Sequence, residues 1–137
     1  MARYYVGQKA SISRTYTRAD VEYFSNLSGD FNPLHLDEAY AKNTRFGKPI
    51  LHGLLTASLL SGLLGSHLPG HGSIYLGQTI RFVKPVYAGD TITANAEVIE
   101  YKPDKGFIRL KTFCSNQHGE IVLEGEASML VPKEEEK

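Results

Sequence analysis

The chain has 137 residues, a length typical of one domain, and its 15 basic residues balance 15 acidic ones. A formal net charge of zero gives no reason to expect nucleic acid or an anionic membrane as a partner. The longest apolar stretch, residues 50–64, is too short and too polar to span a bilayer, and residues 1–17 show no signal-peptide pattern. We therefore expect a cytoplasmic protein with a single domain over residues 1–137, of which residues 133–137 form a flexible tail.

The first predicted elements are a strand and a helix. Residues 10–16 alternate loosely between apolar and polar side chains, which indicates a short strand. Thr17 and Asp20 have the spacing of a capping box, which predicts a helix that begins directly after Thr17. Gly29 and Pro33 end that helix, because glycine permits a turn and proline disfavours helix at the residue before it.

Two further helices are expected before residue 70. The shorter covers residues 37–42. The longer covers residues 52–66. It has a helical pattern in which apolar residues, mostly leucine, lie on nearly every side. A helix that has no polar face is typically buried, so this segment is predicted to form the centre of the core.

The remainder of the chain indicates antiparallel strands joined by short turns. The predicted strands cover residues 73–86, 91–101, 107–114 and 121–131. These elements predict an α+β fold in which a curved antiparallel sheet wraps around the long buried helix, the hot-dog arrangement. The open edge of such a sheet favours pairing with a second copy, so we expect a homodimer or a dimer of dimers.

The densest cluster of polar residues lies at residues 28–35, which read S-G-D-F-N-P-L-H. Asp30 and His35 stand five positions apart on a segment that contains both glycine and proline, so both side chains can face one cavity. General acid/base chemistry requires two such groups of different pKa. The alternative is structural: Asp30 would hold a turn and His35 would cap or pack.

Residues 24–41, F-S-N-L-S-G-D-F-N-P-L-H-L-D-E-A-Y-A, resemble the hydratase motif of the MaoC-like (R)-specific enoyl-CoA hydratases. The resemblance extends over F-G-K-P-I-L-H-G at residues 46–53, the helix that follows, and residues 72–90. It implies the hot-dog fold. It also implies reversible syn hydration of a trans-2-enoyl thioester of coenzyme A to the (R)-3-hydroxyacyl thioester, with Asp30 and His35 as catalytic residues.

The reaction develops negative charge on the thioester oxygen, which needs a hydrogen-bond donor. Gly53 is expected to supply it, because a residue that opens a helix has a free N–H. By the resemblance Ser61 orients Asp30; the alternative is a bond to the carbonyl of its own helix. Asn32 is expected to hold the loop through its amide. Leu63 and Leu64 are expected to line the acyl pocket.

No cofactor is expected, since coenzyme A is part of the substrate. A metal site would draw on Asp30, His35, Asp37 and His52, but these residues lack the spacing of known zinc motifs. His52 is expected to cap or pack. Cys114 has no histidine nearby in the sequence and is a poor candidate for a nucleophile.

Three other functions remain open. They are a 3-hydroxyacyl-acyl-carrier-protein dehydratase, an acyl-CoA thioesterase, and a non-catalytic module that binds acyl thioesters. The candidates for binding the phosphates of coenzyme A are Arg45, Lys48, Arg81 and Lys84. The sequence does not choose an acyl chain length, or between fatty-acid metabolism and polyhydroxyalkanoate synthesis as the pathway.

Overall fold

The computed structural model describes residues 3–134. Its helices are α1 (Arg18–Ser28), α2 (Pro33–Leu36), α3 (Glu38–Lys42) and α4 (Gly53–Ser66). Its strands are β1 (Lys9–Thr15), β2 (Ile74–Gln78), β3 (Arg81–Phe82), β4 (Thr91–Lys102), β5 (Phe107–Ser115) and β6 (Ile121–Leu130). The strands form one sheet in the order β1-β4-β5-β6-β2, and β3 pairs with β6 beyond the end of β2. All pairings are antiparallel.

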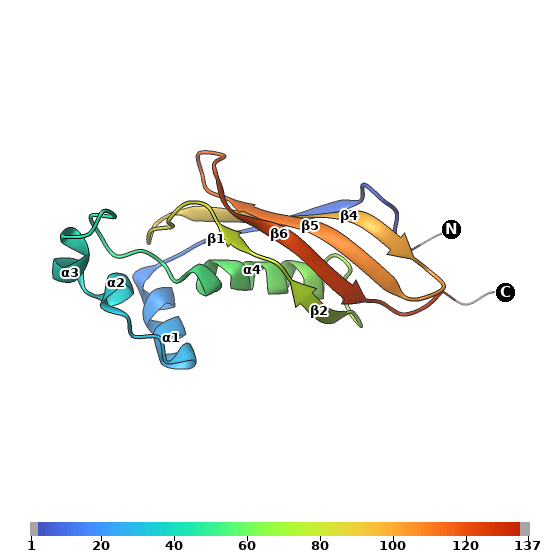
Figure 1. Ribbon diagram of the computed structural model, residues 1–137, viewed down its shortest axis with the longest axis horizontal. Coiled ribbons are helices and arrows are strands. Elements are labelled where there is room, and N and C mark those ends of the chain that lie inside the picture. Colours follow the sequence, from blue (N-terminus) through green and yellow to red (C-terminus); the bar gives the residue numbers. More distant parts are fainter. Residues whose placement is uncertain (1–2, 135–137) are drawn as a thin grey trace.

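The sheet lies over α4, and the three short helices gather beyond one end of it (Figure 1). Side chains of β4 alternate strictly, so that Ile92, Ala94, Ala96 and Val98 are fully or almost fully buried on the face toward the core. Leucines of α4 pack against this face. The predicted α+β architecture, a helix held against a curved antiparallel sheet, is therefore confirmed.

One face of α4 departs from the prediction of burial on every side. Leu54 is 62% exposed, and the exposed residues continue along the same face at Ser58, Ser61, Gly62 and Gly65. The reason is geometric, because a sheet covers a helix from one side only. Among residues 3–134, no element covers the remaining side of α4.

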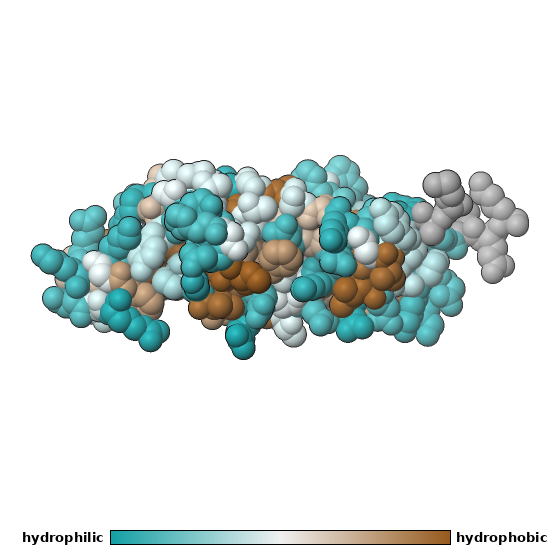
Figure 2. Space-filling view, turned by 90° about the horizontal axis from the view of Figure 1, so that it is seen from above, coloured by the Kyte–Doolittle hydropathy of each residue, from teal (hydrophilic) through white to brown (hydrophobic). Residues whose placement is uncertain are grey.

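The opposite, outer face of the sheet is mixed in polarity. On β4, the half-buried Thr93, Asn95 and Glu97 alternate with the core residues. Figure 2 views the molecule from above the sheet, where separate hydrophobic patches lie among hydrophilic residues. This alternation is typical of an antiparallel sheet with one face on the core and one toward solvent.

The strand predicted over residues 73–86 is in fact two strands, β2 and β3. Between them Thr79 approaches β6, where its N–H donates to the Glu126 carbonyl at 2.9 Å. A Cβ atom on Gly125 would lie 1.7 Å from the Thr79 carbonyl oxygen, so only glycine permits this approach. The chain therefore bends where β2 gives way to β3.

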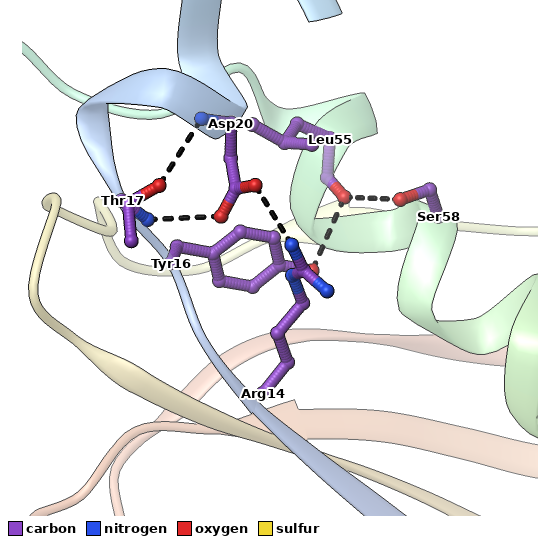
Figure 3. A network of polar contacts seen from close by, with 6 residues as sticks. All are labelled: Arg14, Tyr16, Thr17, Asp20, Leu55 and Ser58. Carbon is purple, nitrogen blue, oxygen red and sulfur yellow. Dashed lines mark hydrogen bonds and ion pairs between the residues drawn. The ribbon is translucent and has the colours of Figure 1, made fainter. Parts of the chain in front are cut away.

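A polar network joins β1, α1 and α4 (Figure 3). The predicted capping box is present, since the Thr17 hydroxyl accepts the Asp20 N–H and the Asp20 carboxylate accepts the Thr17 N–H. Arg14 forms an ion pair with Asp20 at 2.7 Å. The hydroxyl of the buried Tyr16 donates to the Leu55 carbonyl at 3.4 Å. These contacts hold the start of α1 beside the first turns of α4.

The end of the chain is only partly within the described residues. Lys133 and Glu134 have no regular secondary structure, although the Glu134 carboxylate accepts the N–H of Arg3 at 2.7 Å. Residues 135–137, the rest of the predicted tail, lie outside the described residues. Within the described part of the chain, no helix has the length and apolar character needed to cross a bilayer.

Candidate active site

A cavity of about 600 Å³ opens beside the first turn of α4. Such a volume lies in the usual range for sites that enclose a small organic ligand. Its wall is mostly apolar, with leucine, valine and phenylalanine side chains from α4, β3 and β6. The polar or charged residues along it are Ser28, Asp30, His35, Arg45, His52, Thr56 and Lys84. The cavity therefore combines an apolar wall with one concentrated set of ionisable groups.

The loop that carries Asp30 is built from short-range hydrogen bonds. Gly29 ends α1 in the left-handed conformation (φ 80°), and its N–H donates to the Ser25 carbonyl at 2.8 Å. The Asp30 carboxylate accepts the N–H of Asn32 at 3.1 Å. Asn32 in turn caps α2, since its side-chain oxygen accepts the N–H of Leu34 at 3.0 Å. Asp30 itself is exposed at the cavity.

His35 lies on α2 and is only 9% exposed. Its Nδ1 atom is 2.8 Å from the Ile50 carbonyl oxygen, which can only accept a hydrogen bond. Nδ1 therefore carries a proton, and Nε2 is the nitrogen that can exchange one. Arg18 holds the same turn by donating to the carbonyls of His35 and Leu36. The ring is thus fixed in both its tautomer and its orientation.

The fold brings Asp30 and His35 together, and it adds His52. One ligand atom of each of these three residues lies within 4.8 Å of the other two. Of the residues considered for a metal, Asp37 is elsewhere and caps α3 by accepting the Tyr40 N–H. Both imidazoles already use one nitrogen at a main-chain carbonyl. A carboxylate beside two imidazoles, with Nε2 of His35 free to exchange a proton, suits general acid/base chemistry.

His52, which was expected to cap or pack, packs inside the site. It is the N-cap residue of α4, yet its side chain makes no capping hydrogen bond. Instead its ring is 2% exposed and stacks on the ring of His35, with centroids 4.0 Å apart and planes at 29°. The one available signal was its position next to Gly53, at the start of the helix that faces the loop.

Gly53 is the first residue of α4 and lines the cavity. Its N–H lies in the first turn of the helix, where no intrahelical carbonyl can accept it. The ring of Phe82 covers the Cα atom so closely that a Cβ atom there would lie 2.6 Å from the ring. The free N–H at the helix start is thus available to a ligand, and Phe82 limits the space around it.

Three other predicted site residues do not reach the cavity. Ser61 is exposed, more than two helical turns beyond His52, and makes no hydrogen bond to Asp30 among the described residues. Leu63 and Leu64 are fully buried in the core and do not line the cavity. Their assignment to the acyl pocket is wrong for this cavity, because their face of α4 packs against the sheet.

Cys114 does not take part in the site. It is fully buried on β5, and burial raises the pKa of its thiol to about 12. A thiol of that pKa is not a nucleophile at neutral pH. Three further histidines, His67, His71 and His118, are exposed and do not line the cavity.

A helix held by a curved antiparallel sheet, with an acid and an imidazole at the helix start, defines an acid/base enzyme of the hot-dog fold. Residues 6–112 match the model of the MaoC-like domain family. The chain belongs to this family, and relatives of this kind are hydro-lyases. The predicted family and enzyme class are thus confirmed.

Individual relatives agree with this assignment. The chain is 51% identical to an (R)-specific enoyl-CoA hydratase of Aeromonas caviae over 93% of this chain and 95% of the relative. It is 44% identical to an (R)-specific enoyl-CoA hydratase of Rhodospirillum rubrum over 92% of this chain and 87% of the relative. The solved structure of the (R)-hydratase from A. caviae involved in PHA biosynthesis superposes with a TM-score of 0.90 at 50% identity, covering 94% of this chain and 98% of that one.

Proposed function

We propose that the protein is an (R)-specific enoyl-CoA hydratase. It would catalyse the reversible syn addition of water to a trans-2-enoyl-CoA to give the (R)-3-hydroxyacyl-CoA. The observation that carries this proposal is the pairing of Asp30 with His35 at one wall of a largely apolar cavity. The apolar wall suits an acyl chain, and the paired groups suit the transfer of the two protons of water.

In the hydration direction, a C3–O bond forms, the C2=C3 double bond becomes single, and C2 receives a proton. We assign removal of the proton from water to Asp30 and delivery of a proton to C2 to Nε2 of His35, with the ring entering this step protonated at both nitrogens. The proton taken up by Asp30 then passes to Nε2, which restores both groups. The two groups lie on one side of the cavity, so both additions occur on the same face of the double bond. The N–H of Gly53 would donate to the thioester oxygen as it becomes negative.

The decisive experiment is an ultraviolet assay with an enoyl-CoA. Hydration removes the conjugated C=C–C=O chromophore, so absorbance should fall without release of free thiol. Chiral analysis of the product should then give the (R) alcohol. Release of thiol would indicate a thioesterase instead, and saturable binding with no change in absorbance would indicate a binding module.

The carrier is the second point to test. Arg45 and Lys84 are the cationic residues of the cavity wall, and Lys84 is already paired with Glu120. We therefore assign contact with the phosphates of coenzyme A to Arg45. Arg45→Ala should raise KM for an enoyl-CoA but not for the same enoyl group on pantetheine, which lacks the nucleotide phosphates. Activity confined to acyl-carrier-protein substrates would favour the dehydratase.

We also propose that the enzyme is a cytoplasmic homodimer. The uncovered face of α4 and the neighbouring edge strand β2 expose Leu54, Ile74 and Leu76, each more than half accessible. A second copy would cover these apolar side chains and pair the open sheet edge.

A further inference from the structure

The ring of His52 touches both members of the acid/base pair. It stacks on His35, and it also packs against the ring of Phe24, at a centroid distance of 4.8 Å. Its Nε2 atom lies 3.2 Å from the main-chain carbonyl oxygen of Asp30 and 3.2 Å from the Ser25 hydroxyl. Among the hydrogen bonds of the described residues, this contact alone ties Asp30 to a residue more than two positions away.

The contacts determine the tautomer of His52. The Asp30 carbonyl can only accept, so Nε2 carries the proton and donates it. Nδ1 is then a bare lone pair, and this atom is buried with no partner in the described part of the chain. An unmet acceptor is tolerable there, whereas a second proton would leave a buried N–H with no acceptor.

The surroundings favour the uncharged ring for the same reasons. Burial lowers the pKa of His52, the bond to the Asp30 carbonyl opposes this effect, and His35 across the stack lowers it further. The Asp30 carboxylate, the other charged group beside the ring, acts in the raising direction. The net effect lowers the pKa of His52 and favours the uncharged ring.

We propose that His52 is a positioning residue that sets the spacing of Asp30 and His35, through its hydrogen bond to the main chain of one and its stack on the ring of the other. This inference rests on the proposed hydratase function. Asp30 sits on an exposed loop whose own bonds are local, so its distance from the anchored His35 ring depends on His52. The loss of His52 should impair turnover and leave substrate affinity nearly intact.

Two substitutions separate the two contacts. His52→Gln retains an N–H donor near the position of Nε2 but loses the aromatic stack, whereas His52→Phe retains the stack and loses the donor. We expect kcat to fall roughly 10- to 100-fold in His52→Phe, with KM changed less than about threefold, as misplacement of a reacting group predicts. His52→Gln should recover a large part of that loss. The control pair, His118→Gln and His118→Phe, alters an exposed histidine of the β5–β6 turn and should leave both constants unchanged.

A measurement on the unaltered protein tests the inference without activity. Nitrogen-15 NMR of the imidazoles should show His52 as the neutral Nε2–H tautomer, with no titration near the ordinary histidine pKa of about 6.5. A charged His52 at neutral pH, or the Nδ1–H tautomer, would overturn the proposal. So would a folded His52→Phe variant with unchanged kcat. Wild-type protein that fails to hydrate enoyl-CoA would instead refute the proposed function, while the NMR result would still decide the state of His52.

Discussion

At the scale of single residues, the two groups assigned to proton transfer make the simplest test. Asp30→Asn and His35→Gln each preserve size but remove the ability to exchange the required proton. We expect kcat to fall by about 100-fold or more in each variant, the usual range for lost acid/base catalysis. Because Asp30 is exposed and the His35 ring is held mainly through Nδ1, the melting temperature should change little. Steady-state hydration and thermal unfolding check this, and either variant within a few-fold of wild type would rule out the mechanism.

Gly53 supports a second prediction, in which alanine is the matched control for proline. Both substitutions add a Cβ atom that presses on the ring of Phe82, but only proline removes the N–H. Proline fits the backbone, since it is tolerated at the first helical position and His52 before it has the extended conformation (φ −57°, ψ 135°) that proline requires.

Turnover should therefore fall about 100- to 1,000-fold further in Gly53→Pro than in Gly53→Ala, as for the loss of one oxyanion donor. The comparison is made on kcat per folded molecule, with circular dichroism as the measure of folding. Equal turnover in the two variants would mean that the donor lies elsewhere.

At the scale of elements, α4 divides its leucines between the core and the cavity. Leu63→Ala should lower the free energy of unfolding by about 2–5 kcal/mol, because it leaves a hole in a fully buried contact with the sheet. It should not alter the preference for acyl chain length. Phe82→Ala should change the preference for acyl chain length and have little effect on the free energy of unfolding, since that ring is 53% exposed and lines the cavity. Urea unfolding and kcat/KM on short- and long-chain enoyl thioesters measure the two effects, and a change of chain-length preference in Leu63→Ala would restore the earlier assignment.

The same helix explains what its sequence could and could not predict. Residues 53–66 carry leucine in adjacent pairs at 54–55, 59–60 and 63–64. Such pairs predict a helix and its approximate ends, but they point to different sides of it, so no periodicity indicates which side meets the sheet. The exposure of Ser61 and the burial of Leu63 depend on which side of the helix meets the sheet. The break between β2 and β3 was hidden for a related reason, because it depends on Gly125 in a distant strand.

The candidate site likewise contains residues that the sequence could predict and one that it could not. Asp30 and His35 lie within a motif of eight residues, so their partnership was visible in the sequence. His52 meets Ser25 and Asp30 across 27 and 22 positions, and no local pattern encodes such contacts. Its neighbour Gly53 could be predicted because a free N–H at a helix start is a local property.

At the scale of the whole molecule, the uncovered side of α4 and the open edge at β2 predict a dimer. Light scattering should give about twice the 15.2 kDa mass of one chain. Leu76→Asp places a charge on the exposed apolar edge strand and should shift the protein toward monomer. Val6→Asp is the control, since Val6 is 65% exposed but lies beside β1, at the opposite edge of the sheet. Dissociation by Val6→Asp and not by Leu76→Asp would place the interface at the other edge.

The short-range bonds of the Gly29–Leu34 loop have a consequence for how the enzyme loses activity. Asp30 and His35 are held by local turn bonds and by single contacts to His52, Arg18 and Ile50, whereas β4 and β5 are held by long ladders on both sides. Segments with few long-range contacts open locally at a lower free energy than the core. In hydrogen exchange, the amides of residues 29–35 should thus lose protection as one unit, well before those of the central strands. Mild urea should abolish hydratase activity at concentrations where the amides of the sheet are still protected from exchange. Loss of activity and of sheet protection at the same urea concentration would show that the loop opens only with the whole protein.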